Sequence, residues 1–469
     1  MPISHPTMAY STRGSFAAHA LRNLDLLEFL LNHTVLVGLV LVGFFTFRRM
    51  VKSGRQTAHA KKMIEKAIRT QTHEPISLHP DIDPALCAGC GNCTKVCPEG
   101  DILQMIHRKA VLVNPAKCVG HGECEIACPT DAISLVFGTK TRGMDIPHLS
   151  SNYETNVPGL YIAGELGGMG LIRNAIKQGA LAAGHALANL ADEKAQFDLL
   201  IVGAGPAGLA ASLSAIAAKK SYLCVEQNSF GGTVANFPRQ KVVMSQPFSL
   251  PIVGTKKFPS NKFSKEELIA YWEDTRKKTG LKIKEKTGFK ALKRVGKIFE
   301  VETSQGTVTA KKVILAMGVR GSPRRLGVPG ESLSKVTFNL IDPEQYQGQH
   351  VVVVGGGNAG VEAAQMLGAA KWKNKVHLLV RSQSFDRCNE DNEKTIRAME
   401  KQGLVTIWFE SQVSEIRETS IVIKRKEEVT ELLNHFVFIF AGAEMPHKFL
   451  MSLGVQIDKK FGEGLSKAA

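Results

Sequence analysis

Apolar runs of two lengths alternate with polar segments along the chain and predict its elements. Two short runs, DLLIV at 198–202 and HVVVV at 350–354, each lead into a glycine-rich turn and then a helical segment. This order of strand, turn and helix is the pattern of a dinucleotide-binding unit. A longer run covers Phe29–Phe47 and is broken mainly by Asn32 and His33. We therefore expect an α/β fold with two Rossmann-like domains behind an apolar N-terminal helix.

The run Phe29–Phe47 has the length and the flanking charges of a transmembrane helix. Its 19 residues can just cross a hydrocarbon core of about 30 Å. A cleaved signal peptide and a buried core helix are the alternatives. Arg13 and Arg22 precede the run, and a basic stretch follows it: Arg48, Arg49, Lys52, Arg55, Lys61, Lys62 and Lys66. The positive-inside rule thus predicts a single-span anchor in the cytoplasmic (inner) membrane, with the later domains facing the cytoplasm.

The composition narrows the function classes. A length of 469 residues suits about three domains, and 44% apolar residues suit globular α/β domains. The net charge of +16 comes partly from the basic stretch that follows the apolar run. The sequence shows no nucleic-acid-binding motif and no basic groove interleaved with aromatic residues, so we expect no nucleic-acid partner.

Seven of the nine cysteines fall between Cys87 and Cys128 with the spacing of a bacterial ferredoxin. The first run, CAGCGNCTKVCPEG, has the order in which three thiolates hold one cubane and the fourth reaches a second one. Structural zinc is a distant alternative, because zinc does not need this run. The second run, CVGHGECEIACPT, has His121 in place of its second cysteine. The crossed pattern assigns Cys87, Cys90, Cys93 and Cys128 to cluster one, and Cys97, Cys118 and Cys124 to cluster two, with His121 as a candidate fourth ligand.

The sequence leaves three outcomes open for the second site: a His-ligated [4Fe–4S] cluster, a [3Fe–4S] cluster with His121 unbound, or no cluster. We favour two iron–sulfur clusters, the first [4Fe–4S] and the second altered. Replacing a thiolate by a neutral imidazole removes negative charge and should raise the reduction potential, as histidine does in Rieske centres. Two clusters of different potential would form a directional electron path.

The first glycine-rich turn has the spacing of a pyrophosphate site. Gly203-x-Gly205-x-x-Gly208 lets the backbone approach a pyrophosphate at a helix N-terminus. Glu226 ends the next strand, about 20 residues on, where a carboxylate holds a ribose hydroxyl. A solvated carboxylate at the end of the strand is the alternative for this residue.

The second glycine-rich turn carries Gly355, Gly357 and Gly360, and its second strand ends differently. Arg381 stands there in place of an acid, and Arg387 follows. An arginine at this position accommodates a 2′-phosphate, so NADPH is favoured over NADH.

Several motifs between residues 151 and 460 resemble those of thioredoxin-reductase-like flavoproteins. VPGLYIAGE, VILAMGVRGSPRRLGVPGE and the two glycine turns match this class, and GGTVANFPRQKVVMSQPFSLPIVGTKKF is most similar to its bacillithiol disulfide reductase branch. The resemblance implies FAD in the first domain and NAD(P)H in the second, with hydride passing from nicotinamide to flavin. It also implies FAD contacts at Gly164, Glu165 and Gly318, and a homodimer, the common assembly of relatives.

The chain departs from this class in its cysteines. Thioredoxin reductases carry Cys-x-x-Cys just before the second glycine turn, whereas this chain has KVTFNLIDPEQYQGQ there. Cys224 and Cys388 have no sequence neighbour with which to form a redox pair, and we expect both to be structural thiols. A dithiol relay through this domain is therefore not expected.

The order of the motifs predicts a circularly permuted flavin domain. In relatives the V-P-G-L-Y strand closes this domain near the C-terminus, whereas here it lies at 151–190, before the first glycine turn. Because domain termini usually lie close together, permutation is tolerated. The expected order is an N-terminal tail (1–28), a transmembrane helix (29–47), a basic juxtamembrane segment (48–79), an α+β two-cluster ferredoxin domain (80–140), the closing segment of the FAD domain (141–196), the FAD domain (197–330), the NAD(P)H domain (331–433) and a return to the FAD domain (434–469).

Together these features predict a membrane-anchored NAD(P)H-dependent oxidoreductase that passes electrons between nicotinamide, FAD and ferredoxin-type clusters. The cofactors would carry the chemistry, since the sequence offers no catalytic acid–base residue or thiol pair. The electron donor or acceptor, protein or small molecule, is open, and so is the direction of transfer. A flavin-dependent reductase of a small thiol disulfide and a non-enzymatic redox sensor are the alternatives.

Overall fold

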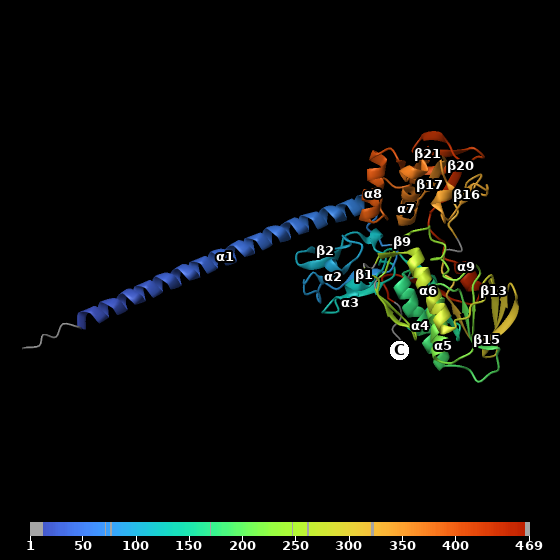
Figure 1. Ribbon diagram of the computed structural model, residues 1–469, viewed down its shortest axis with the longest axis horizontal. Coiled ribbons are helices and arrows are strands. Elements are labelled where there is room, and N and C mark those ends of the chain that lie inside the picture. Colours follow the sequence, from blue (N-terminus) through green and yellow to red (C-terminus); the bar gives the residue numbers. More distant parts are fainter. Residues whose placement is uncertain are drawn as a thin grey trace, which may run out of the picture.

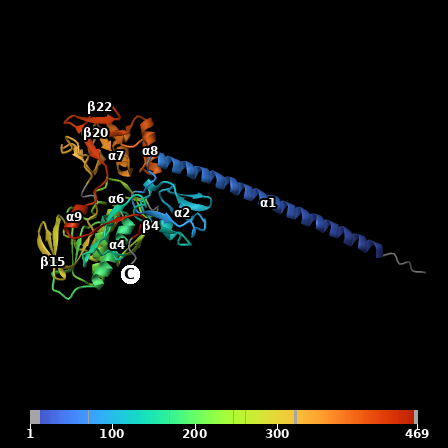
Figure 2. The same ribbon diagram turned by 180° about the vertical axis from the view of Figure 1, so that it is seen from behind.

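The computed structural model describes residues 13–70, 72–75, 77–168, 170–245, 247–259, 262–319 and 323–464, and leaves the side chains of 13–32, 34 and 244 aside. It comprises a long helix, a small cysteine-bearing module and two α/β domains (Figure 1). Helix α1 (Arg13–Arg69) projects away from the body in both views (Figures 1 and 2). It contacts strand β2 of the module, and Ala60 and Ala67, near its C-terminal end, are buried.

The predicted transmembrane helix is not supported. Among the residues searched in the described part of the chain, no helix is long and apolar enough to cross a membrane. The apolar stretch whose side chains are described begins at Val35 and ends before Arg48 and Arg49, which is shorter than the about 20 residues of a span. The first part of the predicted span, and residues 1–12 of the predicted tail, lie outside the described side chains.

The module is built from two antiparallel strand pairs, β1 with β4 and β2 with β3. Its buried core contains Cys93 and Cys124 beside Ile102, Leu103 and Ile133. Because cysteines make up part of such a small core, the packing of the module depends on what they hold. Its elements are β1 (His79–Ile82), α2 (Asn92–Val96), β2 (Leu103–Ile106), β3 (Lys109–Leu112), η1 (Pro115–Lys117), α3 (Glu123–Ile126) and β4 (Ile133–Val136).

The first α/β domain has a sheet with strand order β13-β14-β15-β7-β8, and β6 also pairs with β15. Strands β6, β15, β7 and β8 are parallel, whereas β13 and β14 extend the sheet antiparallel. Strand β6 thus belongs to this sheet although it precedes the first glycine turn. The elements are β6 (Leu160–Ile162), η2 (Glu165–Gly167), α4 (Ile172–Ala188), β7 (Phe197–Val202), α5 (Pro206–Ala217), β8 (Tyr222–Val225), β9 (Val242–Met244), β10 (Phe248–Leu250), β11 (Gly254–Lys256), β12 (Lys262–Ser264), α6 (Lys265–Thr279), β13 (Phe289–Val295), β14 (Ile298–Thr303) and β15 (Gly306–Leu315).

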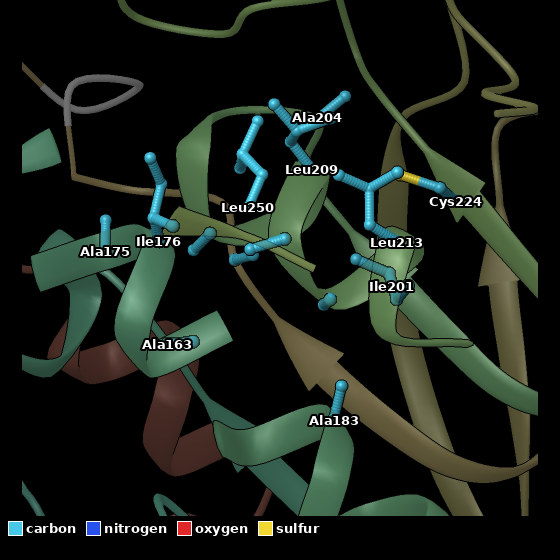
Figure 3. Packing of buried hydrophobic residues seen from close by; sticks show 14 of the residues in the cluster. Ala163, Ala175, Ile176, Ala183, Ile201, Ala204, Leu209, Leu213, Cys224 and Leu250 are labelled. Carbon is cyan, nitrogen blue, oxygen red and sulfur yellow. The ribbon is translucent and has the colours of Figure 1, made fainter. Parts of the chain in front are cut away.

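Helices α4 and α5 pack side by side against this sheet (Figure 1). The core between them and the strands includes Ile201, Leu213 and Cys224 (Figure 3). Gly179 of α4 lies so near α5 that a Cβ there would overlap the carbonyl oxygen of Ala207. The small side chain therefore allows the helix that follows β6 to touch the helix that follows the first glycine turn.

The second α/β domain has a parallel sheet with strand order β16-β23-β17-β18-β19. An antiparallel sheet of β20, β21 and β22 packs beside it, and the two share a hydrophobic core. The elements are β16 (Val336–Thr337), η3 (Pro343–Gln345), β17 (His350–Val354), α7 (Asn358–Leu367), η4 (Ala370–Trp372), β18 (Lys375–Val380), α8 (Glu390–Lys401), β19 (Val405–Phe409), β20 (Ser411–Ile416), β21 (Ser420–Arg425), β22 (Glu428–Leu433) and β23 (Phe436–Ile439).

The C-terminal part of the chain returns to the first α/β domain only after β23, which still belongs to the second sheet, so the return begins after residue 439 and not at the predicted residue 434. Helix α9 (His447–Ser452) contributes Leu450 to the core on the sheet's second face. Strand β24 (Ile457–Lys460) then pairs antiparallel with β5 (Met144–Pro147), which leads toward β6. The end of the chain therefore lies beside the segment that joins the module to the sheet.

Candidate functional site

The first α/β domain gathers the predicted flavin residues at the carboxyl edge of its sheet. The four parallel strands end at the same level. Leu315, the last residue of β15, is paired with Ile162 of β6 and with Val202 of β7, and Val202 is paired with Val225 of β8. The segments that follow these strands carry the two predicted glycine motifs and the predicted acids. Ligands of open α/β sheets bind outside this edge. The predicted flavin residues, which are spread between positions 164 and 318 of the sequence, thus lie together at one edge of the sheet.

The first glycine turn fits a pyrophosphate. Gly203 has φ 105°, and a Cβ there would lie 2.5 Å from the carbonyl oxygen of Ala316. Gly205 caps α5 and has open space where its Cβ would be, while Gly208 packs against the Gly203 carbonyl. The backbone therefore leaves the helix N-terminus free for an anionic group.

Glu226 is buried at the end of β8, with 7% of its surface exposed. Its carboxylate accepts hydrogen bonds from the backbone N–H of Ala204 at 2.8 Å and of Asn228 at 2.9 Å. The alternative of a solvated carboxylate is therefore wrong. Glu226 ties the glycine turn to the strand end, and its predicted contact with a ribose stays a prediction.

Gly164 and Glu165 follow β6 and face the segment that follows β15. The Gly164 N–H donates to Oε1 of Gln178 at 2.7 Å, and Gln178 is almost wholly buried on α4. Glu165 Oε2 lies 4.0 Å from where a Cβ of Gly318 would be. Gln178 was not among the predicted residues. Its sequence signal is a polar residue on the otherwise apolar buried face of α4.

The second glycine turn is built in the same way as the first. Gly355 has φ 133° and approaches the carbonyl of Phe440, and Gly357 caps α7. Gly360 on α7 packs against the carbonyl of Gly355. Arg381 is exposed directly after β18. This turn therefore also presents a helix N-terminus to an anionic group.

Arg387 lies beside the second glycine turn, where its backbone forms a parallel bridge with Gly357. Burial lowers the pKa of its guanidinium, and so do the positive charges of Arg381, Arg142 and Arg324. Arg142 and Arg324 come from outside this domain. Arg324 lies within the motif VILAMGVRGSPRRLGVPGE, whereas no motif marks Arg142. Such a gathering of like charges suits a phosphate-bearing ligand.

The seven clustered cysteines line two separate hollows. The four cysteines assigned to cluster one line a hollow of about 310 Å³, whereas the three assigned to cluster two line another of about 350 Å³ together with His121. The structure therefore divides the ligands as the crossed pattern does. Thiolates are the ligands of iron–sulfur clusters, so both donor sets fit the group.

Burial affects the thiols of these hollows strongly. It raises the pKa of Cys118 to about 11 and that of Cys124 to about 12, and it also raises the pKa of Cys93 and Cys97. Binding of iron would have to displace these protons. In the described part of the chain, no three His, Cys, Asp or Glu side chains are grouped to hold a single metal ion.

His121 lies on the rim of the second hollow. Burial lowers the pKa of its imidazole, opposed by the charge of Glu123 and assisted by that of Arg173. Its Nε2 is 3.8 Å from Glu99 Oε1. A neutral imidazole is the form that binds a metal, so the residue suits a fourth ligand, and its ligation stays a prediction.

Cys224 and Cys388 are fully buried in the two α/β domains. Burial raises the pKa of each thiol to about 12. Both are therefore poor nucleophiles, as expected of structural thiols.

The comparison with protein families decides the class of this chain. Residues 200–464, more than half of the sequence, match the family model described as pyridine nucleotide-disulphide oxidoreductase. The chain belongs to this family. Residues 79–129 match the model of a 4Fe-4S dicluster domain. The predicted resemblance and the predicted ferredoxin-type domain are both confirmed.

The proteins to which this chain is similar include enzymes of two kinds. Bacilliredoxin reductase Bdr of Bacillus subtilis is 28% identical, over 56% of this chain and 82% of its own length. A ferredoxin–NADP reductase of Ignicoccus hospitalis is 31% identical, over 56% of this chain and 83% of its own length. Among solved structures, the bacillithiol disulfide reductase Bdr of Bacillus cereus is 27% identical, with a TM-score of 0.51 over 56% of this chain and 82% of that one.

These matches confirm that the chain is an NAD(P)H-dependent flavoprotein oxidoreductase with an iron–sulfur domain. They also support FAD, NAD(P)H and 4Fe-4S clusters as its cofactors. The α/β class and the ferredoxin-type domain of the predicted fold are likewise confirmed.

Proposed function

We propose that nicotinamide, flavin and the two ferredoxin-type sites form one electron path in this chain. The observation that carries the proposal is the contact between the second hollow and α4. Arg173 of α4 donates to the carbonyl oxygen of His121 at 3.4 Å. Helix α4 follows the loop of Gly164 and Glu165, which lies at the flavin edge. The cysteine module thus meets the flavin domain at the edge where the cofactor would bind.

Each cofactor has its own residues in this proposal. FAD would lie along the carboxyl edge, with its pyrophosphate at Gly203 and Gly205 and its ribose at Glu226. NADPH would use the second glycine turn, with its 2′-phosphate near Arg381. Bound flavin accepts a hydride and can give up electrons singly, which links a two-electron carrier to one-electron clusters.

The position of β6 supports a permuted flavin domain. Its last residue, Ile162, lies level with the end of β15, and β24 at the end of the chain lies beside β5, which leads toward β6. A family member whose chain ran on from β24 would reach β6 by a short path. The proposed consequence is a short covalent connection from the clusters to the flavin edge, which keeps the module at high local concentration.

The external partner in this proposal is a one-electron carrier, protein or small molecule. The ferredoxin–NADP reductase of Ignicoccus hospitalis, named for ferredoxin, supports exchange with a carrier of this kind. The similarity to Bdr favours a second candidate, reduction of a small thiol disulfide. That reaction would need a reactive thiol, whereas Cys224 and Cys388 are both buried with raised pKa values.

An anaerobic titration tests the proposal. The protein would be titrated with NADPH, and separately with NADH, while absorbance follows the flavin and low-temperature EPR follows the clusters. We expect the flavin to bleach and cluster signals to appear, with NADPH acting at lower concentration than NADH. Clusters that dithionite reduces but NADPH leaves oxidised would overturn the single path and favour the disulfide reductase.

The matched control is a Cys93→Ser, Cys124→Ser double variant. These two substitutions remove one predicted ligand from each hollow and leave both glycine turns intact. We expect NADPH to bleach its flavin as in the wild type, with no cluster signal.

A further inference from the structure

Arg173 joins the second hollow to the flavin domain by two contacts, and no sequence motif marks it. It is the second residue of α4. Its guanidinium pairs with Glu123 at 2.5 Å and donates to the carbonyl oxygen of His121 at 3.4 Å. Both of these residues line the second hollow. The contact therefore lies at the wall of the second hollow, where His121 stands in place of a fourth cysteine.

The charge of Arg173 is poorly screened by solvent. Its side chain is 27% exposed and that of Glu123 is 20% exposed. Charges on partly buried side chains interact more strongly than charges in water, because the effective dielectric constant around them is lower. Glu123 lines the second hollow, and its negative charge favours the oxidised form of the site. The positive charge of Arg173 opposes it and favours the form that holds the extra electron, so Arg173 should raise the reduction potential above the value that Glu123 alone would set.

The first hollow has a cation in a different setting. Lys109 donates its Nζ to the carbonyl oxygen of Cys87 at 2.7 Å, but this bond is exposed. Solvent screens an exposed charge and reduces its effect. The two hollows thus differ in the burial of the neighbouring cation as well as in the replacement of a thiolate by His121.

We infer that Arg173 is a positioning residue that holds the His121 loop against α4 and raises the reduction potential of the second site by offsetting the charge of Glu123. The inference rests on the proposed function, because it places the second site on the flavin side of the module. In both views α2, which carries Cys93 of the first site, lies on the side of the module away from α4 (Figures 1 and 2). The first site is then the outer one, and Cys90 is its exposed cysteine.

A redox titration followed by EPR tests this inference without NADPH. Dithionite and mediators set the potential, and the signal lost in Cys124→Ser identifies the second site. In Arg173→Gln we expect the reduced-to-oxidised ratio of that site at fixed potential to fall about tenfold, which is 59 mV for one electron. Arg173→Lys keeps the charge and should restore most of the potential. The first site should be unchanged.

Arg276→Gln is the matched control. Arg276 pairs with Glu285 at 2.8 Å in the same domain, with exposures of 28% and 32%. We expect this substitution to leave both potentials unchanged. Glu123→Gln removes the opposite charge and should raise the potential of the second site.

An unchanged second-site potential in Arg173→Gln, or an equal fall in Arg276→Gln, would overturn the inference. If Arg173→Gln does not fold, Glu123→Gln decides, because an unchanged or lowered potential there contradicts the role of these charges. A wild-type protein whose clusters NADPH does not reduce would overturn the proposed function, while the chemical titration still decides the role of Arg173.

Discussion

Lys241 and Glu362 form an ion pair between the two α/β domains. Lys241 precedes β9 in the first domain, and Glu362 lies on α7, the helix that follows the second glycine turn. Their side chains are only 19% and 24% exposed, and Asn392 also donates to Glu362, at 3.0 Å. The pair therefore connects the helix of the second glycine turn directly to the flavin domain.

We expect Lys241 and Glu362 to be energetically coupled. A double-mutant cycle with Lys241→Met and Glu362→Gln should give a coupling free energy of about 1 kcal/mol in urea unfolding, because the pair is shielded from solvent. Lys278 and Asp274 are the matched control, at 71% and 53% exposure, and their coupling should be no more than about 0.5 kcal/mol. Equal coupling in the two cycles would contradict a stabilising contact between the domains.

Two glycines of α4 should respond to alanine in opposite directions. Gly179→Ala places a Cβ against the backbone of α5 and should destabilise the protein by about 2 kcal/mol. Gly184 is exposed, with no atom within 4 Å of its Cβ position, so Gly184→Ala should stabilise by about 0.5 kcal/mol through helix propensity. Thermal unfolding measures both, and a stabilising Gly179→Ala would mean that the helices are not in close contact.

Removal of iron should loosen the cysteine module and leave the flavin domain intact. The core of the module contains Cys93 and Cys124, whose raised thiol pKa values reflect burial around the hollows. Without iron these cysteines lose the group that would hold them together. Hydrogen exchange after chelation should rise strongly within 79–136 and little within 197–225. Uniform protection before and after chelation would argue against cofactor-dependent packing.

Stability should fall below neutral pH, in part through His377. Its Nδ1 accepts a hydrogen bond from Trp408 Nε1 at 3.0 Å, which requires the neutral imidazole. Burial lowers the pKa of His377, with His350 and Lys375 adding to the effect. The unfolded chain therefore takes up the proton more readily, so the contribution is complete above about pH 6.5 and is lost as the pH falls through the lowered value.

His377→Gln tests this pH dependence, because an amide can accept from Trp408 but does not titrate in this range. Between pH 7 and pH 5 the Tm of both proteins should fall. We expect the decrease in the variant to be about 2 °C smaller than the decrease in the wild type. His59→Gln, at an exposed site, is the control and should follow the wild type. A parallel loss of Tm in His377→Gln would assign the pH dependence to other groups.

The arginines near the second glycine turn should distinguish NADPH from NADH. Arg381→Gln and Arg387→Gln should each raise the KM for NADPH about tenfold and change that for NADH little, since a 2′-phosphate is present only in NADPH. Steady-state reduction of ferricyanide would measure this. Lys394→Gln, an exposed cation of the same domain, is the control. Equal effects on the two nucleotides would exclude recognition of the phosphate.

Local sequence patterns determined the main elements of this protein and predicted the two groups of candidate cluster ligands. Spacing predicted the cysteine runs because three ligands of one cluster lie on a single short loop, and it predicted Gly203 and Gly355 because each turn folds from neighbouring residues. The crossed pattern also assigned Cys128, from the second run, to the group of Cys87, Cys90 and Cys93, and these four cysteines line one hollow. The apolar run Phe29–Phe47 was weaker evidence for its predicted element, because apolar character alone does not determine whether a helix spans a membrane.

The tertiary structure decided which segments distant in the sequence lie side by side. The alignment of β6, β15 and β7 brings Gly164 to Gly203 and Gly318 across long stretches of chain, and only the pairing of strands sets that register. Gln178 and Arg173 have roles that periodicity does not show, since a helix pattern gives the buried face but not the group that faces it. Arg142 reaches the Arg387 site from another part of the chain for the same reason. Contacts between distant segments depend on packing, which no local spacing encodes.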